Sequence, residues 1–345
     1  MRPDLSLIML TVLAGAGQGL FIFLVILDSL ALTGELPTTF TYAAVFLSII
    51  LPSIGMIAST FHLGNPQIGW KALKMWKSSW LSREVILLPA FLGFAVLYLY
   101  CLYAGVPAPA RLIVGYLGVL SSLGLYLSSA MLYAAIHYIK EWANPYTVFN
   151  FILFGLTSGG ALCLALIQIT GLGAEISEPV TSVLIVLGGL SLIAKFLTYR
   201  YNENLYVSWN LRNALGINDP NIRLVDTGAA YAHYNTTEYH YPVTANVNQT
   251  QQNVVLFAAF MVPIFIWSFI LMVNNPPING ALSILAAVLM LAGLLLERKL
   301  FFTQGSHLQN IYYGNFRKKP VKNPILTAGT KTYPTPAAVL RSQEK

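Results

Sequence analysis

His62 and Glu84 are the residues of this chain whose types and positions best support chemistry. His62 follows the second long apolar segment and Glu84 opens the third, so the connecting stretch can return both side chains to one corner. An imidazole with an ordinary pKa of about 6.5 and a carboxylate suit two-electron, two-proton quinone chemistry, in which one group hydrogen-bonds the quinone carbonyl and the other passes the proton. The spacing also allows a simpler alternative, in which His62 bonds to backbone and Glu84 caps the third helix.

Few residues within the apolar segments are ionisable, and among the uncharged residues one amide, Gln18, is a further candidate. Gln18 lies in the small-residue stretch 15–19, where glycines allow close helix contact. Its amide either hydrogen-bonds across that contact or reaches a ligand, if the first span borders the same pocket. Asp28 and Lys195 fall close to span ends, and we predict that water reaches them. The span interiors contain no series of Asp, Glu or His residues of the kind that proton pumps use.

The sequence disfavours a metal or haem site. Cys101 and Cys163 lie far apart in apolar stretches and cannot supply a zinc, Fe–S or disulfide framework. His62 and His137 both fall at span ends on one side, which leaves a bis-His haem open as an alternative, but we expect no haem in this chain. The remaining histidines are expected to be docking or surface residues: His233, His240 and His307.

Eight apolar runs position these residues. The chain has 345 residues, of which 56% are hydrophobic and 10% charged, whereas soluble domains carry about 25% charged residues. The runs are 5–32, 39–60, 85–105, 112–137, 148–169, 180–197, 254–273 and 282–296. We therefore predict an all-α integral membrane protein with eight transmembrane helices. The first run continues past the length of a signal-peptide core, so we expect an uncleaved helix.

The distribution of basic residues predicts the orientation. Eight spans place both termini on one side, and Arg111 is the single one of the 20 Lys and Arg residues that falls on the other side. By the positive-inside rule, both termini are predicted to be cytoplasmic. The net charge of +7 then follows from the topology, and no nucleic-acid partner is needed to explain it.

Three cytoplasmic features are not needed merely to cross a bilayer. The connection between the second and third spans is predicted to be an interfacial helix, with Ile68, Ala72, Trp76 and Trp80 on one face and Lys71, Lys74 and Ser78 opposite. A loop at 201–252, rich in Asn, Thr and Tyr, is predicted to dock a soluble partner. We divide the chain into an anchor domain at 1–300, which includes this loop, and a cytoplasmic tail at 301–345 that is solvated or bound to a partner.

Several separated motifs resemble one family over nearly the full length of the chain. The segments Phe61-His62-Leu63-Gly64-Asn65-Pro66 and Trp80-Leu81-Ser82-Arg83-Glu84-Val85 resemble the signature of membrane anchor subunits of dimethyl sulfoxide reductase type molybdoenzymes. Further motifs in the same order are Thr11 to Leu20, Met131 to Ala134 with Trp142 and Pro145, and Glu297 to Phe302 with His307 and Tyr312 to Gly314. The sequence departs from the family pattern in the long loop, at Gly305 and Ser306, and in the tail.

The resemblance implies an anchor and quinone-site subunit of an oxidoreductase, located in the cytoplasmic (inner) membrane. Its partners are a four-cluster Fe–S subunit and a molybdopterin catalytic subunit, and it exchanges electrons with menaquinone or ubiquinone without a haem of its own. The family's quinol-site histidine and glutamate match His62 and Glu84, and Arg83 and Gln18 complete our set of quinone-binding candidates. We expect no catalytic or metal-binding residue in this chain.

The choice of reaction depends on orientation. The quinone residues, the loop and the tail all fall on the predicted cytoplasmic side, so the soluble subunits should dock there, which is most similar to sulfite dehydrogenases that reduce quinone. A reductase of dimethyl sulfoxide, tetrathionate or polysulfide, in anaerobic or sulfur respiration, is the alternative. A purely structural anchor and a secondary transporter are further alternatives. The spans lack the paired Gly/Pro interruptions and midplane charges typical of transporters.

Overall fold

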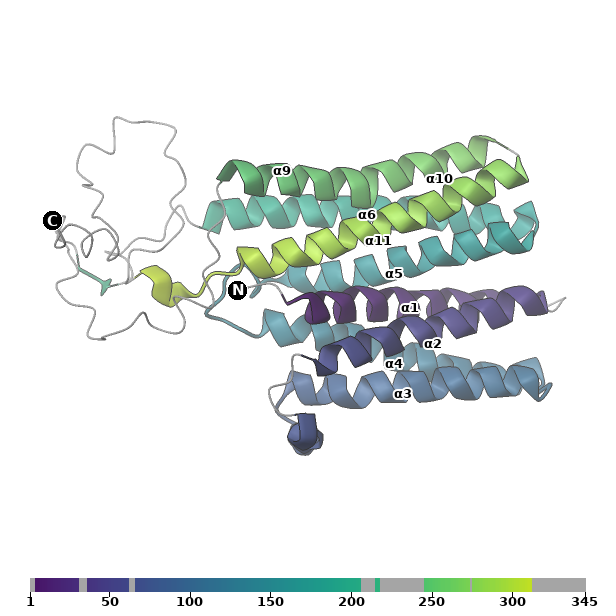
Figure 1. Cartoon of the computed structure of the whole chain (residues 1–345), viewed down its shortest axis with the longest axis horizontal. Helices are drawn as coiled ribbons and strands as arrows, with labels where there is room; N and C mark the ends of the chain where they lie inside the picture. Colours follow the sequence, from purple (N-terminus) through teal and green to yellow (C-terminus); the bar gives the residue numbers. More distant parts are fainter. Residues whose placement is uncertain are drawn as a thin grey trace.

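The eight long helices among the described residues run side by side along one axis in a bundle (Figure 1). A computed structural model describes residues 4–30, 36–61, 66–205, 215–217, 245–273 and 275–311. In these ranges the helices are α1 (Leu5–Leu30), α2 (Thr38–Thr60), η1 (Pro66–Met75), α3 (Trp80–Tyr103), α4 (Ala108–Ala134), α5 (Pro145–Thr170), α6 (Ala174–Leu205), α9 (Ala245–Val255), η2 (Leu256–Met261), α10 (Val262–Met272), α11 (Pro276–Gln304) and η3 (Leu308–Ile311).

The prediction of an eight-helix membrane protein is confirmed. Eight of the described helices are long and apolar enough to cross a bilayer, and the seventh spans Val247–Met272 through α9, η2 and α10. Several helices extend beyond the apolar runs that predicted them, because polar and interfacial residues continue the helix past the apolar segment. α6, for example, covers 174–205 instead of 180–197, and α11 covers 276–304 instead of 282–296.

Local residue chemistry sets the ends of these helices. At the start of α5, the side chain of Asn144 accepts a hydrogen bond from the Thr147 N–H at 3.2 Å, and Pro145 occupies the first helical position. The same helix ends at Gly171, whose φ of +70° is the left-handed conformation that favours glycine. In the seventh span, Pro263 offers no N–H to the preceding turn, and the π-helical segment η2 lies directly before it.

α1 lies between α2 and α5 (Figure 1) and is the most buried of the eight spans. Its contact with α5 depends on glycines: a Cβ on Gly19 would meet the backbone of Gly155 and Gly159, and a Cβ on Gly159 would meet the backbone of Gly19. In a bilayer such small residues let two helix backbones approach closely. The predicted packing role of the small-residue stretch in the first span is therefore confirmed.

The prediction that water reaches Asp28 is wrong. Asp28 is only 4% exposed, and its carboxylate accepts hydrogen bonds from Arg111 at 2.6 and 2.9 Å and from the Tyr98 hydroxyl at 2.6 Å. α1, α3 and α4 each contribute one of these residues. A buried charge in a membrane protein is stable only with such partners, and the sequence did not reveal which helices face each other.

The same prediction is wrong for Lys195. This side chain of α6 is 1% exposed and donates a hydrogen bond to Glu297 of α11. Arg298 Nε lies 3.0 Å from the second carboxylate oxygen of Glu297. Glu297 fell outside the predicted eighth span, which ended at residue 296, so its pairing with Lys195 was not anticipated.

Motif residues that are far apart in the sequence meet at the end of the bundle that holds the start of α1. Trp142 Nε1 donates a hydrogen bond to the Phe301 carbonyl at 2.8 Å, and the Trp142 and Phe301 rings stack with centroids 5.4 Å apart. The Tyr133 ring packs edge-on against Phe302, at 5.5 Å. The motifs at 131–134, 142–145 and 297–302 therefore form one aromatic cluster, and the predicted boundary between residues 300 and 301 falls inside α11.

A 3-10 helix, η1, occupies the predicted interfacial segment. It is seen end-on beside the start of α3 in Figure 1, so its axis crosses that of the bundle. Trp70 and Trp76 are more than half exposed, and Lys74 Nζ lies 5.2 Å from the Trp70 ring centroid. Of the predicted docking loop, residues 206–214 and 218–244 lie outside the described residues, as does the tail from residue 312.

Candidate functional site

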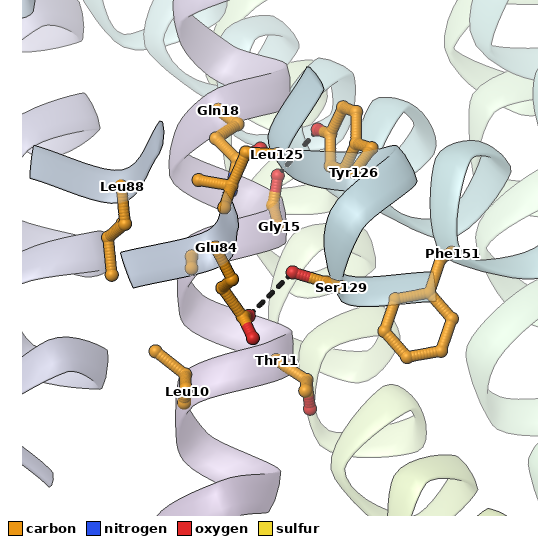
Figure 2. A pocket seen from close by; sticks show the side chains of 11 residues that line it. Leu10, Thr11, Gly15, Gln18, Glu84, Leu88, Leu125, Tyr126, Ser129 and Phe151 are labelled. Carbon is orange, nitrogen blue, oxygen red and sulfur yellow. Dashed lines mark hydrogen bonds between the residues drawn. The ribbon is translucent and has the colours of Figure 1, made fainter. Parts of the chain in front are cut away.

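A small pocket, partly open to its surroundings, lies where α1, α3, α4 and α5 meet (Figure 2). Its lining residues are Leu10, Thr11, Ala14, Gly15, Gln18, Glu84, Leu88, Leu125, Tyr126, Ser129 and Phe151. α1 and α3 contribute residues from near their starts, and α4 from near its end. Because consecutive spans run in opposite directions, these segments come together at one end of the bundle.

Glu84 points into this pocket from α3. The N-cap of α3 is Ser79, whose side chain accepts a hydrogen bond from the Ser82 N–H at 3.4 Å. Glu84 lies one turn further along the helix, so the alternative in which it caps α3 is wrong. Its half-buried carboxylate instead accepts a hydrogen bond from Ser129 Oγ of α4 at 2.6 Å (Figure 2).

Gln18 reaches the same pocket from α1. It is 2% exposed, and among the described residues its Oε1 has no hydrogen-bond partner. The hydroxyls nearby are already used as donors: Tyr126 donates to the Gly15 carbonyl at 2.8 Å, and Thr11 donates to carbonyls one turn back in α1. A buried acceptor without a donor is costly, so this pocket suits a ligand that carries a hydroxyl or N–H group.

The structure does not bring Arg83 to the pocket. Its guanidinium donates hydrogen bonds to the carbonyls of Trp76 and Lys77, at 3.0 and 2.8 Å, and lies 4.0 Å from the centroid of the Trp80 ring. Arg83 therefore joins the end of the interfacial segment to the start of α3. His62 lies outside the described residues, which resume at residue 66.

The pocket is also lined by four residues that were not among the candidates from the sequence: Ser129, Tyr126, Thr11 and Phe151. One signal was available for Ser129, since α4 carries several serines within its apolar run, and polar residues in a span face other helices more often than lipid. Nothing in the sequence distinguished Phe151 from other apolar residues. Among the described residues, no group of three or more His, Cys, Asp or Glu side chains could hold a metal ion.

Comparison with known proteins gives two concordant matches. The sequence model of the family described as "DMSO reductase anchor subunit (DmsC)" matches residues 1–304. The chain is also 32% identical, over 327 residues, to a sulfite dehydrogenase subunit of Allochromatium vinosum. This alignment covers 91% of the present chain and 99% of the relative.

Proposed function

The chain belongs to the DMSO reductase anchor subunit family, and we propose that it is the quinone-reactive anchor of a heterotrimeric molybdopterin oxidoreductase. In this proposal it holds a four-cluster Fe–S subunit and a molybdopterin catalytic subunit at the inner membrane. It passes electrons between the Fe–S subunit and the quinone pool, and it supplies no catalytic residue for the substrate of the molybdopterin subunit. The family assignment supports neither a secondary transporter nor any other class of membrane protein.

The observation that carries the proposal is the convergence of Glu84 and Gln18 on one pocket among apolar helices. An ionised carboxylate accepts a hydrogen bond from a quinol hydroxyl, and the protonated acid donates one to a quinone carbonyl. Glu84 can therefore take or return the proton that accompanies each electron. Gln18 Oε1, which has no partner among the described residues, provides a second acceptor for a hydroxyl of the same ring.

The family motif is the basis for proposing that His62 also contacts the quinone. It follows directly after Phe61, the C-cap residue of α2, and α2 contacts α3, the helix that carries Glu84. We propose that His62 hydrogen-bonds the quinone as the partner of Glu84. Arg83 acts at a distance, because it fixes the junction from which Glu84 extends.

Oxidation of sulfite, with electrons delivered to quinone, is the proposed reaction of the whole complex. The name of the Allochromatium vinosum relative supports it, as does the concentration of basic residues on the side that holds the pocket. A reductase of dimethyl sulfoxide, tetrathionate or polysulfide, driven by quinol oxidation, is the second candidate, and the description of the family favours it.

Replacement of Glu84 by Gln tests the quinone site. The substitution keeps the shape of the side chain and removes its proton capacity, so quinone-linked turnover of the intact complex should fall about 10²-fold. Turnover with a soluble dye should not change, because such a dye exchanges electrons with the partner subunits directly. Glu178→Gln, at an exposed carboxylate of α6, is the matched control and should leave both activities intact. Quinone turnover at the wild-type rate in Glu84→Gln would place the site elsewhere.

Reporter fusions test the proposed orientation. A reporter fused after Lys140, before the start of α5, should lie in the cytoplasm, and one fused after Glu175, in the first turn of α6, should lie in the periplasm. A cytoplasmic signal from the Glu175 fusion would overturn both the orientation and the preference for sulfite oxidation.

A further inference from the structure

The hydroxyl of Ser129 bonds differently from the hydroxyls of neighbouring serines in α4. Ser121, Ser122 and Ser128 each donate to the carbonyl four residues earlier in their own helix, at 2.9, 3.0 and 2.8 Å. Ser129 instead donates across the helix interface to Glu84 Oε1, at 2.6 Å. A serine in a helix has its own i−4 carbonyl within reach, but the Ser129 hydroxyl bonds to the Glu84 carboxyl group instead. Ser129 therefore links α4 to α3 through the carboxylate.

This bond limits the orientations that the Glu84 side chain can adopt. Glutamate has several rotatable bonds, and a fixed contact selects one orientation of its carboxylate from those that these bonds allow. The hydrogen bond to Oε1 occupies one acceptor position and leaves the other carboxylate positions available to a ligand. Both Ser129 and Glu84 line the pocket (Figure 2).

Proton transfer requires the donor and acceptor to be within hydrogen-bond reach, so an acid that is held in place reacts faster than one that is free to turn away. We propose that Ser129 is a positioning residue for the quinone reaction, which holds the Glu84 carboxylate in the orientation from which it exchanges a proton with the quinone ring. This inference rests on the proposed quinone function of Glu84. Ser129 itself neither accepts nor supplies the transferred proton.

The test compares Ser129→Ala with Ser128→Ala in the intact complex in native membranes. Both substitutions remove one hydroxyl from adjacent positions of α4, but only Ser129→Ala removes the contact with Glu84. Loss of the hydrogen bond that holds the Glu84 carboxyl group should lower quinone-linked kcat by about tenfold, while dye-linked turnover and the amount of assembled complex stay unchanged. Ser128→Ala should match the wild type, and Ser129→Thr, which keeps a hydroxyl, should restore most of the lost kcat.

A double substitution separates this inference from the proposed function. When Glu84 is already Gln, Ser129→Ala should cause no further loss, because no proton-exchanging acid remains to be positioned. Full quinone turnover in Ser129→Ala, together with a loss in Glu84→Gln, would overturn the inference and leave the proposed function intact. Full turnover in Glu84→Gln would overturn the proposed function. Equal losses in Ser128→Ala and Ser129→Ala, or no recovery in Ser129→Thr, would show a packing effect and also overturn the inference.

Discussion

Asp28 and Glu84 both place a carboxylate among membrane-spanning helices, but their surroundings differ. Three donor groups, two from Arg111 and one from Tyr98, occupy the two oxygens of Asp28. Glu84 accepts a hydrogen bond from Ser129 and lies in an open pocket beside a Gln18 oxygen that has no partner among the described residues. Polar groups are expensive in a bilayer wherever they occur. A fully bonded group offsets that cost by holding helices together, whereas an incompletely bonded one leaves room for a ligand.

The Lys195–Glu297 pair belongs with Asp28 in this comparison. Lys195 donates to one oxygen of Glu297, and Arg298 Nε lies 3.0 Å from the other. The guanidinium of Arg298 also lies 4.0 Å from the centroid of the Phe151 ring, on the side of α5. The pair therefore holds α6 against α11 next to the aromatic cluster, and we assign a structural role to this pair.

The largest loss of stability is expected when Glu297 is replaced by Gln. This substitution leaves the buried cations Lys195 and Arg298 without their shared counter-charge, and removal of one partner from a buried pair costs about 3–5 kcal/mol. The complex should become less abundant in membranes and unfold at a lower temperature in mild detergent. Quinone-linked and dye-linked activities should fall together. A selective loss of the quinone-linked activity would show that this cluster acts in the reaction rather than in structure.

A smaller loss of stability is expected for Asp28→Asn. Asparagine can keep one contact with Arg111, and Arg111, at 8% exposure, lies one turn from the start of α4 and can extend toward the interface. We expect a loss of about 1–3 kcal/mol, measured by thermal unfolding, with no separation between the two activities. A double variant, Asp28→Leu with Arg111→Met, should recover part of the stability, because it leaves no unpaired charge. A double variant less stable than the single one would contradict a simple ion-pair role.

The sequence predicted the helices and two of the residues that line the candidate pocket, Gln18 and Glu84. Long apolar runs define spans because a bilayer requires them, and the glycines around Gln18 predicted the close contact of α1. Glu84 was identified because it is a carboxylate at the edge of a span. The hydrogen bond between Ser129 and Glu84 was not predictable, since it depends on which face of α4 meets α3. The pairs of Asp28 and Lys195 were missed for the same reason, and because helices extend beyond their apolar runs.

The smallest effect is expected for Gln18→Met, which should weaken quinone binding without a loss of stability. Met has nearly the same length as Gln and removes a buried oxygen that has no partner among the described residues, so the free energy of unfolding should stay the same or rise slightly. The KM for quinone should rise about tenfold, because one hydrogen bond to the ring is lost, while dye-linked turnover stays unchanged.

Gln304→Met is the matched control for that test. Gln304 is also buried, at 5% exposure, but its Nε2 donates a hydrogen bond to Asn248 Oδ1 at 3.2 Å, and it does not line the pocket. Its replacement should lower the stability by about 1 kcal/mol and leave the KM for quinone unchanged. The two variants should therefore differ in opposite ways, with a higher KM and unchanged stability for Gln18→Met and an unchanged KM and lower stability for Gln304→Met, if Gln18 binds the quinone as proposed. A stability loss in Gln18→Met with an unchanged KM would assign Gln18 to packing and contradict its place in the quinone site.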